Sequence, residues 1–441
     1  EVVLAKVVVE VAVGALRIDF FGLGRHPVAA AGAAAVGEQA HADRYTYLPL
    51  NGLFIMLVWA GIHWAAGLAS RQRLAVAVAI VSLAVCGWLS HDQLQDWKNG
   101  VTAFGRTVSL TRNNPTALNN LGNALRFRDF VKEALPLFEE SARIRPSQTS
   151  LMNAGYTHIE LGRDELGLLN IRRAFVLDPY GSVAKDAFAA TAATAKSSPD
   201  PIHERILAIA QATRSRYEEA SKHTAHAIQL APKNPNILID HAAYLAMAGS
   251  DAAAVQSLRA AIALVPTNAL AHSNLGALLA KQGQPDEAFT HYAHALAADP
   301  TNPSTRHNQA LLLDRVGRLA DAKREFESVI NTSPRHWPAR QQLAWLLATR
   351  AECRDGAAAV RLANDALSLL GAKTPAQLDV MAAAHAAAGD FRTAASLARE
   401  ALTALKAGEN PAIKTAIEAR LQKYQSSQVH TEDSPPPVRS K

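Results

Sequence analysis

The sequence predicts an all-α protein in which the C-terminal transmembrane helical hairpin of a membrane region is followed by a right-handed α-solenoid of paired helices. Two charge-free stretches near the N-terminus predict the hairpin, because each is about long enough to cross the hydrocarbon layer. Proline recurs every 34 residues through much of the remaining chain, and small residues keep fixed offsets from it. A fixed period of this length predicts stacked helical pairs.

The composition limits the classes of function. The 441 residues include 45 Lys and Arg against 39 Asp and Glu, which gives a formal net charge of +6. Residues 1–96 hold six of the basic and seven of the acidic residues, so the remaining chain is only mildly basic. A charge this dilute does not indicate a nucleic-acid partner. The two cysteines exclude a disulfide framework, and no cofactor is expected.

Residues 1–96 are predicted to form the membrane region, with spans at about 50–69 and 74–90. Positions 45–70 and 74–91 carry no charged side chain, and a helix crosses the hydrocarbon layer with about 20 apolar residues. The alternative is a pair of buried helices in a soluble domain, which two adjacent charge-free stretches disfavour. The sequence has neither an initiator Met nor a recognisable signal peptide, so we expect it to begin inside a longer protein.

The short loop between the two spans sets the expected orientation. It contains Arg71 and Arg73 and no acidic residue, and Lys and Arg favour the cytoplasmic side of a membrane. The residues after Ser90 are therefore expected to lie outside the cytoplasm, as the soluble part of a multi-pass membrane protein.

The region that follows has the pattern of repeated helical pairs. The prolines that mark its period are Pro146, Pro179, Pro232, Pro266, Pro300 and Pro334. Gly122 and Gly276 stand where a first helix must approach its second helix closely, and Tyr292 or Phe326 is expected to fill the space between such helices. Two blocks, 115–181 and 201–408, hold eight units at 115–147, 148–181, 201–234, 235–268, 269–302, 303–336, 337–373 and 375–408.

The segments outside these units have other patterns. A connecting helix is predicted at 97–114, and an Ala-rich inserted helix is predicted at 182–200. A cap helix is expected at 409–425, because a solenoid needs a polar terminal element. Residues 426–441 contain three successive prolines and are predicted to be a disordered tail.

These residues resemble known families. The 34-residue period, with its Gly, Ala and Tyr or Phe positions, resembles the tetratricopeptide repeat (TPR). Residues 37–50 (GEQAHADRYTYLPL) and 52–59 (GLFIMLVW) resemble a segment of bacterial TPR membrane proteins and of the animal transmembrane-and-TPR O-mannosyltransferases. Trp97-Lys-Asn-Gly and the WLLAT motif at 345–349 resemble later parts of the same proteins. The resemblance covers roughly 37–425.

The resemblance implies a GT-C-type membrane domain that uses a lipid-linked sugar, with the TPR array on the extracytoplasmic side of a bacterial inner membrane. The catalytic acids of such enzymes lie in an early loop that no residue here matches, so the chain as given is expected to have no catalytic residue. One hypothesis is a membrane-anchored scaffold whose array binds polypeptide partners. The other is the C-terminal part of a protein O-glycosyltransferase whose array presents the acceptor protein, with a polyprenyl-phosphate sugar as a further partner.

The candidate peptide-binding residues share one register of the first helices, two residues before the small packing residue. This position lines the inner surface of the resembled arrays, where O-GlcNAc transferase uses Asn to hold peptide backbone. An amide can donate to a carbonyl and accept from an N–H, so it can hold a chain of any sequence. The register holds Asn120, Asn153, Asp240, Asn274, Asn308 and Gln342, and is interrupted by Ile206 and Val380. The alternative is that these side chains bond only between repeats.

Two further groups are candidates for binding. Asn119, Asn123 and Asn153 resemble part of the clamp with which chaperone-type TPRs hold a C-terminal carboxylate, although Asn119 stands where that clamp has Lys. A second group before the first span would contact lipid phosphate or, in the favoured alternative, anchor the chain in the aromatic belt of the interface. Its members are Asp43, Arg44, Tyr45 and Tyr47.

Two histidine pairs have a spacing that can bind metal on a helix, His223 with His226 and His291 with His294. We expect no acidic or Cys residue to complete a set of ligands with either pair. We therefore predict packed or solvated histidines and no metal site.

Overall fold

The structure, a computed structural model, describes residues 97–405 and 411–432 and scattered positions between 73 and 91. All regular secondary structure in these residues is helical. None of the helices that could be assessed there is both long and apolar enough to cross a membrane. The spans expected at 50–69 and 74–90 fall outside the described residues except for those scattered positions, so the predicted hairpin gains no support here.

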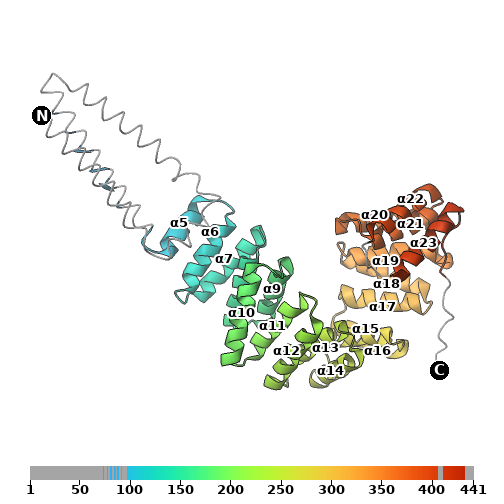
Figure 1. The fold of residues 1–441 in the computed structure, drawn as a ribbon, viewed down its shortest axis with the longest axis horizontal. Helices are drawn as coiled ribbons and strands as arrows, with labels where there is room; N and C mark the ends of the chain where they lie inside the picture. Colours follow the sequence, from blue (N-terminus) through green and yellow to red (C-terminus); the bar gives the residue numbers. More distant parts are fainter. Residues whose placement is uncertain are drawn as a thin grey trace. The chain divides into compact units, whose positions relative to one another are not determined.

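The chain divides after Leu177 into two compact units. Their helices are labelled in Figure 1. In the described part of the first unit, each helix packs on the next one along the chain. These helices are α5 (Gly100–Leu110), α6 (Pro115–Arg126), α7 (Val131–Ile144), α8 (Gln148–Glu160) and α9 (Asp164–Leu177). They form one leading helix and two antiparallel pairs.

The second unit continues the pattern of pairs, again with each helix packed on the next. Its helices are α10 (Ser182–Ser197), α11 (Pro201–Ala212), α12 (Tyr217–Leu230), α13 (Pro235–Met247), α14 (Asp251–Leu264), α15 (Ala269–Lys281), α16 (Pro285–Ala298), α17 (Pro303–Arg315), α18 (Leu319–Thr332), α19 (Trp337–Thr349), the short 3₁₀ helix η2 (Ala351–Cys353), α20 (Gly356–Leu370), α21 (Pro375–Ala387), α22 (Phe391–Ala404) and α23 (Pro411–Gln425). The odd-numbered helices from α11 to α21 are the first helices of their pairs. From α13 to α21, neighbouring first helices also touch one another.

Local sequence explains where the first helices begin and end. The side chains of Asn114, Asn234, Asn268 and Asn302 each accept a backbone N–H at a helix N-cap. Most first helices are followed, two or three residues after their last residue, by one with positive φ, and the next N–H bonds back to a carbonyl of the last turn, which reverses the chain. These residues are Asp129, Gly162, Ser215, Gly249, Gly283, Gly317 and Gly389.

Close packing within the pairs confirms the role expected for Gly122 and Gly276. A Cβ on Gly276 would lie 2.8 Å from Cε1 of Tyr292, and one on Gly122 would lie 2.7 Å from Cε1 of Phe138. Both rings are fully buried. The glycines therefore let the aromatic ring of the second helix lie directly on the backbone of the first.

The C-terminal end differs from the disorder predicted for 426–441. Helix α23 packs on α22, and its Ile417 and Tyr424 are buried in the same apolar cluster as Ala394 and Ala398. Residues 426–432 then leave α23 and make hydrogen bonds to residues near the end of α19. Residues 433–441 lie outside the described residues.

Candidate peptide-binding face

The predicted register falls on successive first helices, and its polar side chains are half-buried. In the first unit it holds Asn120 on α6 and Asn153 on α8. In the second unit it runs through Asp240 on α13, Asn274 on α15, Asn308 on α17 and Gln342 on α19. Because neighbouring first helices touch, these last four residues form one row, which we call the first-helix row. Buried Ile206 on α11 and Val380 on α21 end the row on its two sides.

Three amides of the first-helix row are available to a ligand. Within the described part of the chain, the side chains of Asn274, Asn308 and Gln342 have no hydrogen-bond partner, and all three retain some exposure to solvent. Each amide therefore offers both a donor and an acceptor from one side of three adjoining helices. An extended polypeptide has matching N–H and C=O groups along its backbone.

Two other register residues bond between repeats, as the alternative interpretation expects. The Asn153 amide donates to Oδ1 of Asn119 at 3.0 Å. The Asp240 carboxylate accepts from Nε and Nη2 of Arg205 at 3.0 and 2.8 Å. The same contact involves two of the three residues of the predicted carboxylate clamp, because Asn119 and Asn153 bind each other. The third, Asn123, is exposed.

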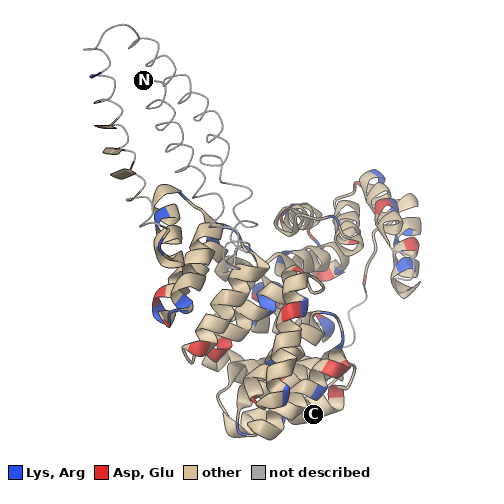
Figure 2. Cartoon of the chain, turned by 60° about the vertical axis from the view of Figure 1, so that its left-hand side comes forward, with Lys and Arg blue, Asp and Glu red and all other residues tan. Residues whose placement is uncertain are grey.

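Sequence reasoning missed a set of ion pairs that join the first helices of successive repeats. They are Arg126 with Glu160, Arg205 with Asp240, and Asp314 with Arg350. The available signal was opposite charge at a spacing of 34 to 36 residues, one repeat length. Elsewhere in the described residues, charges of both signs are interspersed over the helices (Figure 2).

The histidine pairs have partners that the sequence did not reveal. Glu204 on α11 lies 2.7 Å from Nδ1 of His223 and 3.0 Å from Nδ1 of His226, although it stands 19 residues before the first of them. His272 and His291 meet at 2.8 Å between their Nδ1 atoms at the same spacing. Burial, and then the neighbouring His272, lowers the pKa of His291. Among the described residues, no group of three His, Cys, Asp or Glu is arranged to hold a metal ion.

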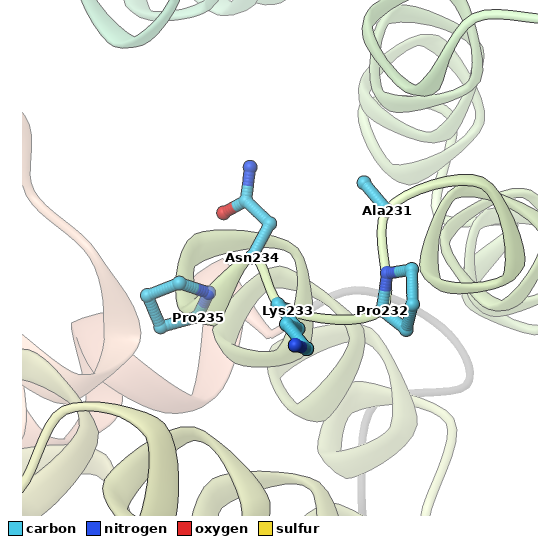
Figure 3. A pocket seen from close by; sticks show the side chains of 5 residues that line it. All are labelled: Ala231, Pro232, Lys233, Asn234 and Pro235. Atoms are coloured by element: carbon cyan, nitrogen blue, oxygen red, sulfur yellow. The ribbon is translucent and has the colours of Figure 1, made fainter.

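Two other candidate places contribute little to the site. A shallow surface hollow lies in the loop between α12 and α13 (Figure 3). It is lined by Ala231, Pro232, Lys233, Asn234 and Pro235. The oxygen of Asn234 is already used by the N–H of Asn236, so this hollow does not present convergent free polar groups. The interface group at 43–47 lies outside the described residues.

Comparisons with known proteins identify the repeats. A family model described as TPR repeat matches residues 246–283, and models described as tetratricopeptide repeat match residues 116–145 and 269–302. Solved structures similar to the chain include the type IV pilus biogenesis factor PilW, at 18% identity and a TM-score of 0.44 over 49% of this chain and 98% of that one. Another is the APC/C hetero-tetramer Cut9–Hcn1, at 10% identity and a TM-score of 0.47 over 75% of this chain and 95% of that one.

Two curated proteins share part of the sequence. Protein O-mannosyl-transferase TMTC3 of Mus musculus is 24% identical over 194 residues, which are 43% of this chain and 20% of that protein. Protein O-mannosyl-transferase Tmtc3 of Drosophila melanogaster is 31% identical over 124 residues, 28% of this chain and 13% of that protein. The matched part spans one fifth or less of these relatives. The family models show that this chain contains tetratricopeptide repeats, and the repeated helical pairs of the described residues agree with them.

Proposed function

We propose that the chain is a membrane-anchored TPR scaffold whose first-helix row binds extended polypeptide partners. The observation that carries the proposal is the row of amides at Asn274, Asn308 and Gln342 on touching helices, which have no hydrogen-bond partner among the described residues. The N–H and C=O groups of a bound peptide backbone must find hydrogen-bond partners. Each amide of the row supplies both a donor and an acceptor, so binding does not depend on the side chains of the peptide. The family matches support it, since TPR folds generally bind polypeptides.

The binding test is a pair of matched double variants. Asn274→Ala with Asn308→Ala removes two amides of the row, whereas Asn331→Ala with Asn364→Ala removes two exposed Asn side chains from the second helices α18 and α20. Each lost amide should weaken binding by about 0.5–1.5 kcal/mol, so the first variant should bind a partner about fivefold to a hundredfold more weakly.

The partner is first captured with a photo-crosslinking residue at position 342, and its affinity is then measured for each variant. The row is purely structural if the Asn274 and Asn308 variant keeps full affinity. The same conclusion follows if the second-helix control loses affinity instead.

The location of the array belongs to the same proposal. The arginines of the loop before residue 74 favour a cytoplasmic hairpin turn and hence an extracytoplasmic array in a bacterial inner membrane. Alkaline phosphatase fused after Gln425 should be active in a bacterial host, because the enzyme needs an oxidising compartment for its disulfides. An inactive fusion, with a cytoplasmic reporter active at the same position, would reverse the assignment.

A second candidate function is supported by the similarity to the two O-mannosyl-transferases. In that case the chain is the C-terminal part of a glycosyltransferase, with a polyprenyl-phosphate sugar bound by spans that precede residue 1, and the TPR array presents the acceptor protein. An upstream reading frame with several spans and an acidic first extracytoplasmic loop would favour this function. A start codon at the position of residue 1 would count against it.

A further inference from the structure

The chain leaves the end of α23 in a defined direction. The end of α23 is closed by two backbone hydrogen bonds, from Ser427 N–H to the Tyr424 carbonyl at 3.1 Å and from Gln428 N–H to the Lys423 carbonyl at 2.8 Å. Ser427 has the left-handed φ of 58° that this helix ending requires. Tyr424 is buried against the last repeat and holds α23 in place. The residues that follow α23 therefore start from a fixed position.

Residues 428–432, which we call the C-terminal segment, reach the end of α19. The N–H of Glu432 donates to the carbonyl of Thr349 at 3.0 Å. Thr349 is the last residue of α19, so its carbonyl has no partner within the helix. The C-terminal segment therefore satisfies a backbone acceptor that α19 leaves without an intrahelical partner, in the way that a bound peptide does.

Side chains add a charge contact and a hydroxyl contact. Nη2 of Arg350 lies 3.4 Å from Oε2 of Glu432, and the Arg350 side chain is only 8% exposed. Nη2 of Arg354 donates to Oγ1 of Thr431 at 2.7 Å. Arg350 also donates to the Asp314 carboxylate at 2.9 Å, so it stays in place when Glu432 is absent.

An aromatic contact completes the arrangement. The ring of His430 lies 6.1 Å from that of Trp345 on α19, and its buried Nδ1 has no hydrogen-bond partner among the residues that the structure describes. On the same tryptophan, the guanidinium of Arg420 lies 5.4 Å from the ring while it pairs with Asp379 on α21. The tryptophan is thus fixed by α23, and His430 binds an already ordered surface.

We propose that the C-terminal segment is an internal ligand, and that Trp345, Thr349, Arg350 and Arg354 form a binding site for extended acidic peptides of partners. In the absence of a partner, the side chains of His430, Thr431 and Glu432 of the chain itself occupy this site. A partner must displace it, because both bind the same backbone carbonyl and the same arginines. This inference rests on the proposed function only in treating the first helices as the polypeptide-binding elements.

Tethering explains why so few contacts hold the segment. A segment joined by a short linker to its own site has an effective concentration on the order of millimolar, so a weak intrinsic affinity fills the site. Glu432 remains 32% exposed in its side chain, and Thr431 is exposed. These contacts can therefore exchange with those of a partner peptide without unfolding a repeat.

The test compares the full chain with two shortened chains, one that ends at Gln428 and one that ends at Asp433. Both keep the hydrogen bonds that close α23, but only the second keeps residues 429–432. The probe is a fluorescein-labelled peptide with the sequence of residues 428–441, and its binding is measured by anisotropy. The chain that ends at Gln428 should bind it at least about tenfold more tightly than the other two, because their tethered segment competes.

Two further variants test the named contacts in the chain that ends at Gln428. Arg354→Ala should weaken peptide binding severalfold, whereas Arg361→Ala, which removes an exposed arginine from α20, should leave it unchanged. A peptide with Glu432→Lys should bind weakly to every chain. Equal effects of the two arginine variants would overturn the assignment of the site.

The inference fails if the probe does not bind the folded chain that ends at Gln428, or binds all three chains equally. Retained helicity and retained hydrogen-exchange protection of α23 establish that this chain is folded. Because Asn274 and Asn308 lie outside the site, partner capture that depends on them while the probe fails to bind would overturn this inference alone. Probe binding with no effect of those two residues on partner capture would overturn the proposed function alone.

Discussion

Substitution of Gly276 tests the packing that defines each helical pair. A Cβ there would lie 2.8 Å from Cε1 of Tyr292 and 3.2 Å from the backbone carbonyl of Ala288. Tyr292 is 1% exposed, so its ring has no space into which it can move. Overpacking of this kind costs about 1–3 kcal/mol, against about 1 kcal/mol gained when Ala replaces Gly in a helix. Gly276→Ala should therefore be neutral to destabilising by about 2 kcal/mol, and Gly276→Leu should cost about 3 kcal/mol or more.

Hydrogen exchange is the suitable assay, because each repeat mainly contacts its neighbours and unfolding need not be all-or-none. For Gly276→Leu, a cost of about 3 kcal/mol should accelerate hydrogen exchange by about a hundredfold or more, since each 1.4 kcal/mol is a factor of ten. The acceleration should appear first within residues 235–302. Gly105→Ala is the matched control, because no atom of the described residues lies within 4 Å of a Cβ at that helical position, and it should gain up to about 1 kcal/mol. Acceleration spread evenly along the array would refute the nearest-neighbour solenoid, and equal effects at both glycines would refute the packing argument.

Two further predictions follow from charges. Burial, and then the cations Arg420 and Lys423, lower the pKa of His430 from 6.5 to about 4, so the bound segment favours the neutral imidazole. Binding of the labelled peptide to the chain that ends at Gln428 should therefore be full above pH 6.5. It should weaken by up to about tenfold per pH unit as the pH falls toward 4. A peptide with His430→Phe should lose this dependence between pH 6.5 and 5. Arg205→Ala removes the guanidinium that pairs with half-buried Asp240 and should destabilise α11–α13 by about 1–3 kcal/mol. Lys281→Ala, which breaks an exposed pair with Asp251, should cost less than about 1 kcal/mol.

The helical pairs were predictable from the sequence because their causes are local. Asn at the N-cap, Pro in the first turn and Gly at 249, 283 and 317 each act within a few residues, and they recur with the period. The first-helix row was predictable for the same reason, as a register counted from the small packing residue. The partners of the row residues were not predictable. Asp240 accepts from Arg205, whereas Asn274 has no partner within the described part of the chain, and this difference depends on a side chain one repeat away.

The ordering of the C-terminal segment could not be predicted for a different physical reason. Residues 428–432 have no apolar periodicity and contain Gln, Thr and Glu, so their composition favours solvent. Their order comes from contacts with residues about 80 positions earlier in the chain, and nothing in the local sequence encodes those contacts. The prolines that predict disorder stand at 435–437, beyond the residues that make the contacts.

An irregularity in one repeat creates the site that the C-terminal segment occupies. The other first helices from α6 to α21 are each followed by a residue with positive φ. In the turn that this residue forms, backbone N–H groups donate to carbonyls at the end of the helix. Helix α19 instead continues into η2, and the N–H of Asp355 bonds to the carbonyl of Leu347. The carbonyl of Thr349 is bound by the N–H of Glu432 instead. The second helix then begins at Gly356, where a Cβ would lie 2.3 Å from a backbone nitrogen at the end of α21. Residues 350–355 therefore replace the usual turn, leave the Thr349 carbonyl to the N–H of Glu432, and supply Arg354 beside it.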